Sequence, residues 1–115
     1  MIAVAENRTF NLGLLSRIPL GEGKCFRVAG EEIAVFHTRQ GTAFATDARC
    51  PHKGGPLADG LVGEGRVICP LHSQAFDLAT GEAVRGGCSA LRTYPTRVSS
   101  TGDVFVDVGL ERVDG

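Results

Sequence analysis

Two short segments of this chain each bring one cysteine and one histidine together. The first is Cys50-Pro51-His52, the second is Cys69-Pro70-Leu71-His72, and residues 53–68 separate them. Thiolate sulfur and neutral imidazole nitrogen are ligands for zinc and for iron–sulfur clusters. The two segments therefore predict one metal centre whose ligands are Cys50, His52, Cys69 and His72.

The order of these ligands distinguishes between two kinds of metal centre. Each half of the motif mixes one Cys with one His, which suits a Rieske-type [2Fe–2S] cluster, where two Cys hold one iron and two His hold the other. A Cys₂His₂ zinc site uses the same ligand types, but common zinc fingers pair Cys with Cys and His with His. We therefore favour the iron–sulfur cluster. The zinc alternative would leave the purified protein colourless instead of red-brown.

The charges of the ligands predict what such a cluster would do. Two thiolates and two neutral imidazoles leave the oxidised cluster formally neutral, whereas four thiolates would make it more negative. Because a less negative centre accepts an electron more easily, the potential rises from about −400 mV to roughly −150 to +300 mV. The predicted chemistry is electron transfer at moderate potential, with the imidazoles as a route for the electron or a coupled proton.

The chain has four cysteines, which could instead form two disulfides. Cys50 and Cys69 are each followed closely by His, which a metal site requires and a disulfide does not. We therefore expect Cys25 and Cys88 to be free thiols. Cys25 is interpreted as a small, partly buried packing residue in a strand, and Cys88 lies in a loop that could close over the cluster.

Other chemistry-bearing residues have simpler interpretations. His37 is expected to be a hydrogen-bonded strand histidine, Arg49 and Lys53 to be solvated charges, and Tyr94 to pack only; an acidic partner for Arg49 and Lys53 is the alternative. The sequence has no Ser/His/Asp set, acid–base carboxylate pair or phosphate loop. We therefore expect no catalytic apparatus beyond the metal centre.

Composition narrows the class of protein. The chain has 115 residues and a formal net charge of −1, which argues against nucleic-acid binding. No apolar run reaches the roughly 18–20 residues of a membrane span, and residues 1–10 do not resemble a secretory signal. We expect a single cytoplasmic domain over residues 1–115.

Short apolar runs bounded by Gly and Pro predict an all-β protein of small antiparallel sheets. The two ligand segments lie at strand ends, within a cluster-binding subdomain of about residues 48–90. Turns are expected at 39–41, 79–82 and 101–103. The expected strands are Phe10–Leu15, Cys25–Val28, Ile33–Thr38, Thr42–Thr46, Leu61–Val62, Arg66–Cys69, Gln74–Asp77, Thr96–Ser99 and Val104–Val108.

Beyond the ligands, the sequence resembles the Rieske [2Fe–2S] ferredoxin-like family from about residue 10 to 108. The segments 52–57, 76–83 and 93–98 are most similar to the small subunit of assimilatory NAD(P)H nitrite reductase. The resemblance implies the Rieske iron–sulfur fold and the same four ligands. It also implies a low potential, near roughly −150 mV, because Gly55, Leu71 and Phe76 replace the extra cysteines and the tyrosine of high-potential relatives, and Gln74 replaces their serine.

The resemblance also implies a redox partner. In the nitrite reductase family, a large subunit with flavin, a further iron–sulfur cluster and sirohaem reduces nitrite to ammonia, and this chain would be its electron-carrying subunit. A ferredoxin that passes electrons from a flavin reductase to an aromatic-ring-hydroxylating dioxygenase or similar oxygenase is the alternative. A redox or iron sensor, or a purely structural module, is a third class.

Overall fold

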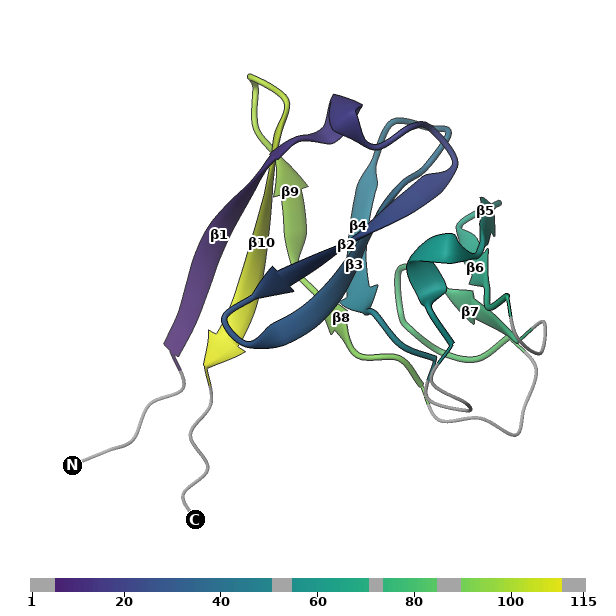
Figure 1. Ribbon diagram of the computed structural model, residues 1–115. Coiled ribbons are helices and arrows are strands. Elements are labelled where there is room, and N and C mark those ends of the chain that lie inside the picture. Colours follow the sequence, from purple (N-terminus) through teal and green to yellow (C-terminus); the bar gives the residue numbers. More distant parts are fainter. Residues whose placement is uncertain (1–5, 51–54, 71–73, 85–89, 111–115) are drawn as a thin grey trace, which may run out of the picture.

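The computed structural model describes residues 6–50, 55–70, 74–84 and 90–110. In this part of the chain, short strands form three antiparallel sheets, and the helical segments are two single 3₁₀ turns (Figure 1). The predicted all-β class with small antiparallel sheets is confirmed. The elements are β1 (Glu6–Leu14), η1 (Leu15–Arg17), β2 (Glu22–Val28), β3 (Glu31–His37), β4 (Ala43–Asp47), η2 (Leu57–Asp59), β5 (Leu61–Gly63), β6 (Arg66–Ile68), β7 (Ala75–Asp77), β8 (Thr93–Tyr94), β9 (Thr96–Val98) and β10 (Asp103–Leu110).

Two of the sheets share one hydrophobic core. The sheets have the strand orders β1-β10-β9 and β2-β3-β4-β8, and the chain passes from the second to the first at Pro95. Apolar side chains from both sheets pack together, because alternate strand residues face inward. This core consists of Leu15, Ile18, Val28, Ile33, Val35, Ala45, Tyr94, Val104, Val106 and Val108.

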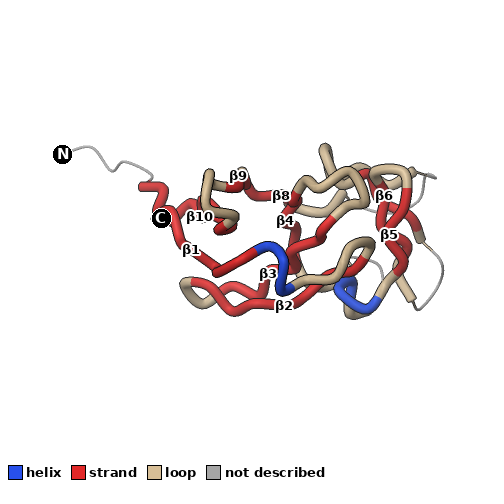
Figure 2. The backbone as a smooth tube through the Cα atoms, turned by 90° about the horizontal axis from the view of Figure 1, so that it is seen from above, coloured by secondary structure: helices blue, strands red, loops and turns tan. Residues whose placement is uncertain are grey.

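The third sheet, β5-β6-β7, lies at one end of the molecule beside the β2-β3-β4-β8 sheet (Figures 1 and 2). Both sheets contribute side chains to a second core. Two of the predicted ligands, Cys50 and Cys69, belong to it. Its members are Ala34, Phe36, Ala48, Cys50, Leu57, Val62, Val67, Cys69, Phe76, Leu78 and Leu91.

Two tight turns join neighbouring strands through residues with positive φ. Ala29 and Gly30 connect β2 to β3 with φ values of 52° and 82°, and Glu64 and Gly65 connect β5 to β6 with 52° and 75°. A two-residue hairpin loop requires this conformation because its twist matches that of the strands. The predicted turns at 39–41, 79–82 and 101–103 are confirmed, each with a glycine of positive φ.

The predicted strands are present, with different ends. The largest difference is at β1, which begins at Glu6 instead of Phe10 because its polar start pairs with the end of β10. The sequence prediction missed β8, whose two residues pair with Ala45 and Thr46 of β4. No helix in the described ranges has the length and hydrophobicity to cross a membrane.

Candidate metal centre

Cys50 follows strand β4 in a loop that closes on itself. The Cys50 N–H donates a hydrogen bond to the Gly55 carbonyl (2.9 Å), and the Leu57 N–H donates to the Ala48 carbonyl (2.9 Å). These bonds hold the two ends of the loop together, and Cys50 is only 3% exposed. His52, the predicted second ligand from this loop, lies outside the described residues.

Cys69 directly follows strand β6, and its backbone extends the β6–β7 pairing by one step. The Cys69 N–H donates to the Gln74 carbonyl (2.7 Å), next to the Ile68–Ala75 pair of the ladder. Val67 and Cys69 are buried while Ile68 is 38% exposed, as the alternation of a strand requires. The cysteine therefore points to the inner face of the sheet. His72 lies outside the described residues.

The two cysteines fit a metal centre. They are both buried, they belong to the same cluster of packed side chains, and neither forms a disulfide. Two unbridged thiols brought together in this way are what one iron of a Rieske cluster needs. Among the described residues no group of three metal-ligating side chains is found, as expected when two of the four ligands lie outside that part. The buried Gln74 Oε1 atom, which has no hydrogen-bond partner, is a further polar group in this region.

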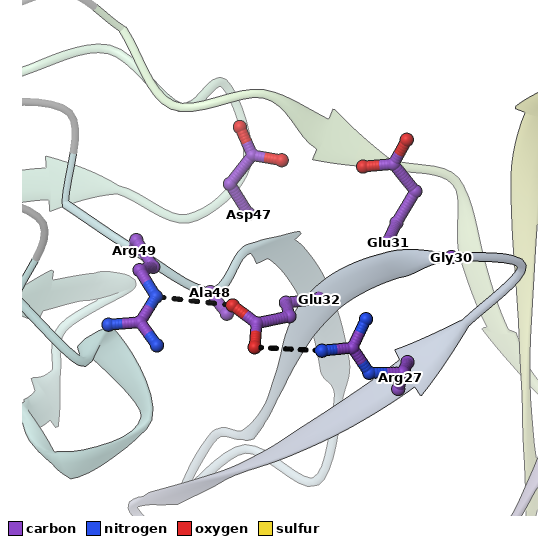
Figure 3. Close-up of a pocket in the computed structure, with 7 residues that line it drawn as sticks. All are labelled: Arg27, Gly30, Glu31, Glu32, Asp47, Ala48 and Arg49. Carbon is purple, nitrogen blue, oxygen red and sulfur yellow. Dashed lines mark hydrogen bonds and ion pairs between the residues drawn. The ribbon is translucent and has the colours of Figure 1, made fainter.

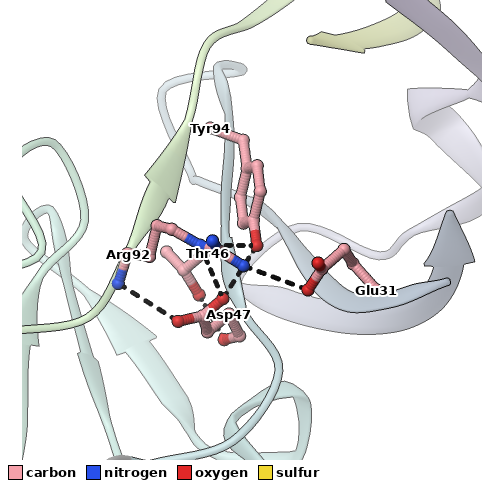
Figure 4. Close-up of polar contacts among 5 residues, drawn as sticks. All are labelled: Glu31, Thr46, Asp47, Arg92 and Tyr94. Atoms are coloured by element: carbon pink, nitrogen blue, oxygen red, sulfur yellow. Dashed lines mark hydrogen bonds and ion pairs between the residues drawn. The ribbon is translucent and has the colours of Figure 1, made fainter. Parts of the chain in front are cut away.

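A polar network links the chain entering the Cys50 loop to the strand that follows residue 90 (Figure 4). The Tyr94 hydroxyl donates to Asp47 Oδ1 (2.8 Å), and Arg92 Nε donates to the Tyr94 hydroxyl oxygen (3.0 Å). Arg92 Nη2 also donates to Glu31 Oε1 (3.0 Å), and the backbone joins too, because the Asp47 N–H donates to the Arg92 carbonyl (2.9 Å). The prediction that Tyr94 packs only is therefore wrong: its ring packs in the first core, and its hydroxyl holds two segments together.

The network fixes the protonation of its members. Burial raises the pKa of the Tyr94 hydroxyl, and its hydrogen bond to the Asp47 carboxylate raises it further. Partial burial works against the charge of Arg92, but Tyr94, Asp47 and Glu31 outweigh it and raise the pKa of the guanidinium. Tyr94 therefore remains a neutral donor and Arg92 a cation across the ordinary pH range.

Charged side chains also line an open polar pocket that includes Ala48 and Arg49, the two residues before Cys50 (Figure 3). Arg49 Nε donates to Glu32 Oε1 (3.1 Å), and Arg27 Nη2 contacts Glu32 Oε2 (3.4 Å). The Ala48 N–H also donates to the Glu32 carbonyl (3.2 Å). The prediction that Arg49 is a solvated charge is confirmed, because its side chain is 63% exposed even in the ion pair with Glu32. Arg49 directly precedes Cys50 in the sequence.

Of the remaining residues interpreted from the sequence, one is confirmed, one is wrong and two are not described. His37 is a hydrogen-bonded strand histidine as predicted, since its Nδ1 lies 2.6 Å from the Ile18 carbonyl oxygen. The prediction that Cys25 is partly buried is wrong: it lies on the exposed face of β2, at the edge of its sheet, as a free thiol. Lys53 and Cys88 lie outside the described residues.

Sequence inspection missed Asp47 and Arg92, and it named Gln74 only as the residue that replaces a serine of high-potential relatives. All three are polar residues next to strand ends. Their contacts depend on pairings between distant segments, such as β4 with β8, which periodicity does not reveal. The available signal was Arg92 and Tyr94 two residues apart in an extended segment, which places both side chains on one side of the chain.

Comparison with known proteins gives the family. Residues 10–107 match the Rieske-like [2Fe-2S] domain. The ferredoxin component of naphthalene 1,2-dioxygenase/salicylate 5-hydroxylase systems from Ralstonia sp is 38% identical over 91 residues, covering 75% of this chain and 83% of the relative. The 3-phenylpropionate/cinnamic acid dioxygenase ferredoxin subunit of Escherichia coli K12 is 33% identical over 89 residues, with coverages of 76% and 83%.

Solved structures agree on the fold. A Mycobacterium tuberculosis protein assigned as an NADH-dependent nitrite reductase small subunit superposes with a TM-score of 0.82, at 23% identity, over 96% of this chain and 99% of that one. Sphingomonas yanoikuyae B1 ferredoxin gives a TM-score of 0.76 at 29% identity, over 88% and 99%. The chain thus belongs to the Rieske-like [2Fe–2S] family and is a Rieske-type electron-transfer ferredoxin with one [2Fe–2S] cluster.

Proposed function

We propose that Cys50, His52, Cys69 and His72 hold the cluster. The observation that carries this assignment is the shared burial of Cys50 and Cys69 as unbridged thiols in one group of packed side chains. The two loops that bring them together each contain one histidine shortly after the cysteine. His52 and His72 complete the ligand set that a Rieske cluster requires. We further propose that residues 1–115 act as one domain, whose cluster-binding part is about 48–90.

The surroundings of the two cysteines support a low potential within the Rieske range. When bound, the cluster supplies a one-electron couple at moderate potential. Hydrogen bonds from the protein to its sulfur atoms raise that potential. The N–H groups of Cys50 and Cys69 donate instead to backbone carbonyls within their own loops. Phe76, fully buried next to this site, has no hydroxyl to donate.

We propose the small subunit of an assimilatory NAD(P)H-dependent nitrite reductase as the specific role. Segments 52–57, 76–83 and 93–98 support it, because their sequences resemble that subunit. The Mycobacterium tuberculosis structure is compatible with the role, since its fold covers 96% of this chain. The partner is then a large catalytic subunit.

A ferredoxin component of an oxygenase system is the second candidate. The observation that favours it is sequence identity, because the 33–38% identical relatives carry electrons in dioxygenase systems. In this role the chain would accept an electron from a reductase and deliver it to an oxygenase.

Affinity purification and electron delivery separate the two candidates. The tagged chain is co-expressed with the candidate large subunit or with the candidate oxygenase, and NAD(P)H-dependent nitrite reduction is measured with and without the chain. We expect the chain to co-purify with the large subunit and to raise its rate. Cys69→Ser is expected to remove this gain, whereas the matched control Cys25→Ser, on an exposed strand face, keeps it.

The opposite pattern would overturn the nitrite reductase role. If the chain neither binds the large subunit nor changes its rate, but transfers electrons from a flavin reductase to the oxygenase, the second candidate is correct. If the loaded chain transfers electrons to neither acceptor and no reductase reduces it, both candidates fail and the third class, a sensor or structural module, remains.

A further inference from the structure

The β5-β6-β7 sheet has an inner face that packs and an outer face that is exposed. Val62, Val67 and Phe76 point into the second core, and each of them is at most 9% exposed. The residues next to them point to the other face, because side chains alternate along a strand. On this outer face Leu61 is 72% exposed and Ile68 is 38% exposed. Exposed large apolar side chains that gather on one face mark a contact surface for another protein.

Strand pairing arranges the outer face in two rows that run across the strands. In the first row Leu61 pairs with Ile68, and Ile68 pairs with Ala75. The segment after β7 adds a fourth position, because the Val84 N–H donates a hydrogen bond to the Ala75 carbonyl (2.8 Å). Val84 is 40% exposed. The first row is therefore apolar from one side of the sheet to the other, and an open pocket follows it.

The second row of the outer face carries charges. Gly63 pairs with Arg66, and Arg66 pairs with Asp77. The Asp77 N–H donates to the Glu82 carbonyl (2.9 Å), so Glu82 takes the fourth position. The order across the sheet is thus a glycine, a cation and two anions. Within the described ranges Arg66 forms no ion pair, so its charge is available to a partner.

The two rows are complementary to a second copy of themselves. A two-fold axis parallel to the strands, between β6 and β7, reverses the order of the positions and keeps each row opposite the same row. It sets Ile68 of one copy over the small Ala75 of the other. It also sets Arg66 of one copy over Asp77 of the other, and the symmetry forms this opposite-charge pair twice. Sheets that pack face to face with aligned strands, about 10 Å apart, meet in this way.

We propose that the outer face of the β5-β6-β7 sheet binds a second copy of this chain in a symmetric dimer. Charge complementarity selects this occupant, because reversing the charged row brings its cation opposite an anion at two positions. Four strand positions about 4.8 Å apart and two rows about 7 Å apart give a patch of a few hundred Å² per copy. This area is below the roughly 800 Å² per partner of a standard interface, so the dimer is weak and forms at high protein concentration.

Exchange of the two charges tests the symmetry. Full-length loaded chains with Arg66→Asp and with Asp77→Arg are measured separately and as a mixture, by sedimentation equilibrium from micromolar to millimolar concentration. Each variant alone should dimerise at least about tenfold more weakly than the wild type, because its dimer contains two like-charge contacts. The mixture should regain most of the wild-type affinity, since the mixed dimer contains both opposite-charge pairs.

Two results of this experiment would overturn the proposal. One is a mixture that associates no more strongly than the separate variants. The other is a wild-type chain that stays monomeric at millimolar concentration, which would leave the face to a different protein partner.

A second pair of variants covers the case in which Asp77→Arg does not fold, because Asp77 Oδ1 also accepts hydrogen bonds from the Ala79 and Thr80 N–H groups. Val84→Asp and Val98→Asp change the same residue type at 40% and 39% exposure, and Val98 lies in β9, outside this sheet. We expect Val84→Asp to weaken the dimer at least about tenfold, by placing a charge in the apolar row. Val98→Asp should leave it unchanged. Equal dimer affinities in these two variants would show that this face is not the contact surface.

Discussion

Cys50 and Cys69 differ from Cys25 in burial and in the number of packed neighbours. The first two are 3% and 2% exposed within one packed cluster, whereas Cys25 lies on an exposed strand face. Because a metal ligand needs neighbours that fix its direction, this difference supports the proposal that Cys50 and Cys69, and not Cys25, are ligands.

Serine substitutions should separate these roles. We expect Cys50→Ser and Cys69→Ser to lose most of the bound iron and the visible absorption, and to unfold at lower temperature, because metal binding is coupled to folding. Cys25→Ser should retain both. Iron and sulfide content with thermal unfolding provides the measurement, and a Cys69→Ser variant that keeps full iron content would contradict the assignment.

Tyr94 makes stability depend on pH. Its pKa is raised above the ordinary value near 10, so the folded state holds the phenol proton more tightly than the unfolded chain does. This contribution is complete below about pH 10 and is lost as the pH rises toward the folded-state pKa.

Removal of the hydroxyl tests this contribution. Tyr94→Phe should cost about 1 kcal/mol at pH 8, because Asp47 and Arg92 lose a shared partner. The free energy of unfolding, measured by urea denaturation at pH 8 and pH 11, should fall less with pH in the variant than in the wild type. The same pH dependence in both would show that Tyr94 does not control it.

At the scale of elements, the segment after β7 depends on one glycine. Gly81 has a φ of +82°, and its carbonyl accepts a hydrogen bond from the Leu91 N–H (2.7 Å). A Cβ atom there would collide with the Leu91 carbonyl oxygen, which is backbone and cannot rotate away. Gly81 therefore permits the close approach that fixes Leu91 in the second core.

A matched pair of glycine substitutions measures this requirement. We expect Gly81→Ala to destabilise the protein by about 1–3 kcal/mol through strain at positive φ, with further loss from the collision. Gly63→Ala in β5 meets open space and has no positive φ, so it should be neutral or slightly stabilising. Chemical denaturation of both variants gives the comparison, and equal stabilities would refute the requirement.

The elements also show where sequence reasoning succeeds. Local signals placed most strands and all three expected turns, because alternating apolar residues and turn glycines act within a few residues of one another. The Cys-Pro-His and Cys-Pro-Leu-His segments are local in the same sense; of the four ligands that they predict, the structure describes Cys50 and Cys69. The sequence did not predict β8 or its polar network, because the two residues before Pro95 form a strand only when they pair with β4.

Gln74 shows the same limit within the site. Its sequence position next to the second ligand segment gives no indication of an unsatisfied buried amide. Only the pairing of Cys69 with Gln74 places the side chain on the inner face. Likewise, Cys25 follows an apolar strand pattern, yet β2 is an edge strand whose outer face is exposed.

At the scale of the whole molecule, the three sheets form two separate cores. The β1-β10-β9 and β2-β3-β4-β8 sheets form a scaffold with its own core, and the β5-β6-β7 sheet lies at one end of the molecule (Figure 1), beside the second core that contains Cys50 and Cys69 of the proposed site. The Asp47–Arg92–Tyr94 network joins the end of β4, which leads to Cys50, to β8 and the residue before it. The arrangement places a buried pair of cysteines at this end of the molecule.

A reductive titration of the reconstituted protein, followed by EPR, tests the central claim most directly. The chain is expected to take up one electron per two irons, with a midpoint near roughly −150 mV, because neither cysteine N–H nor Phe76 can donate to the cluster. A colourless protein that binds zinc instead of iron, or a midpoint above roughly +100 mV, would contradict the account of a low-potential Rieske electron carrier.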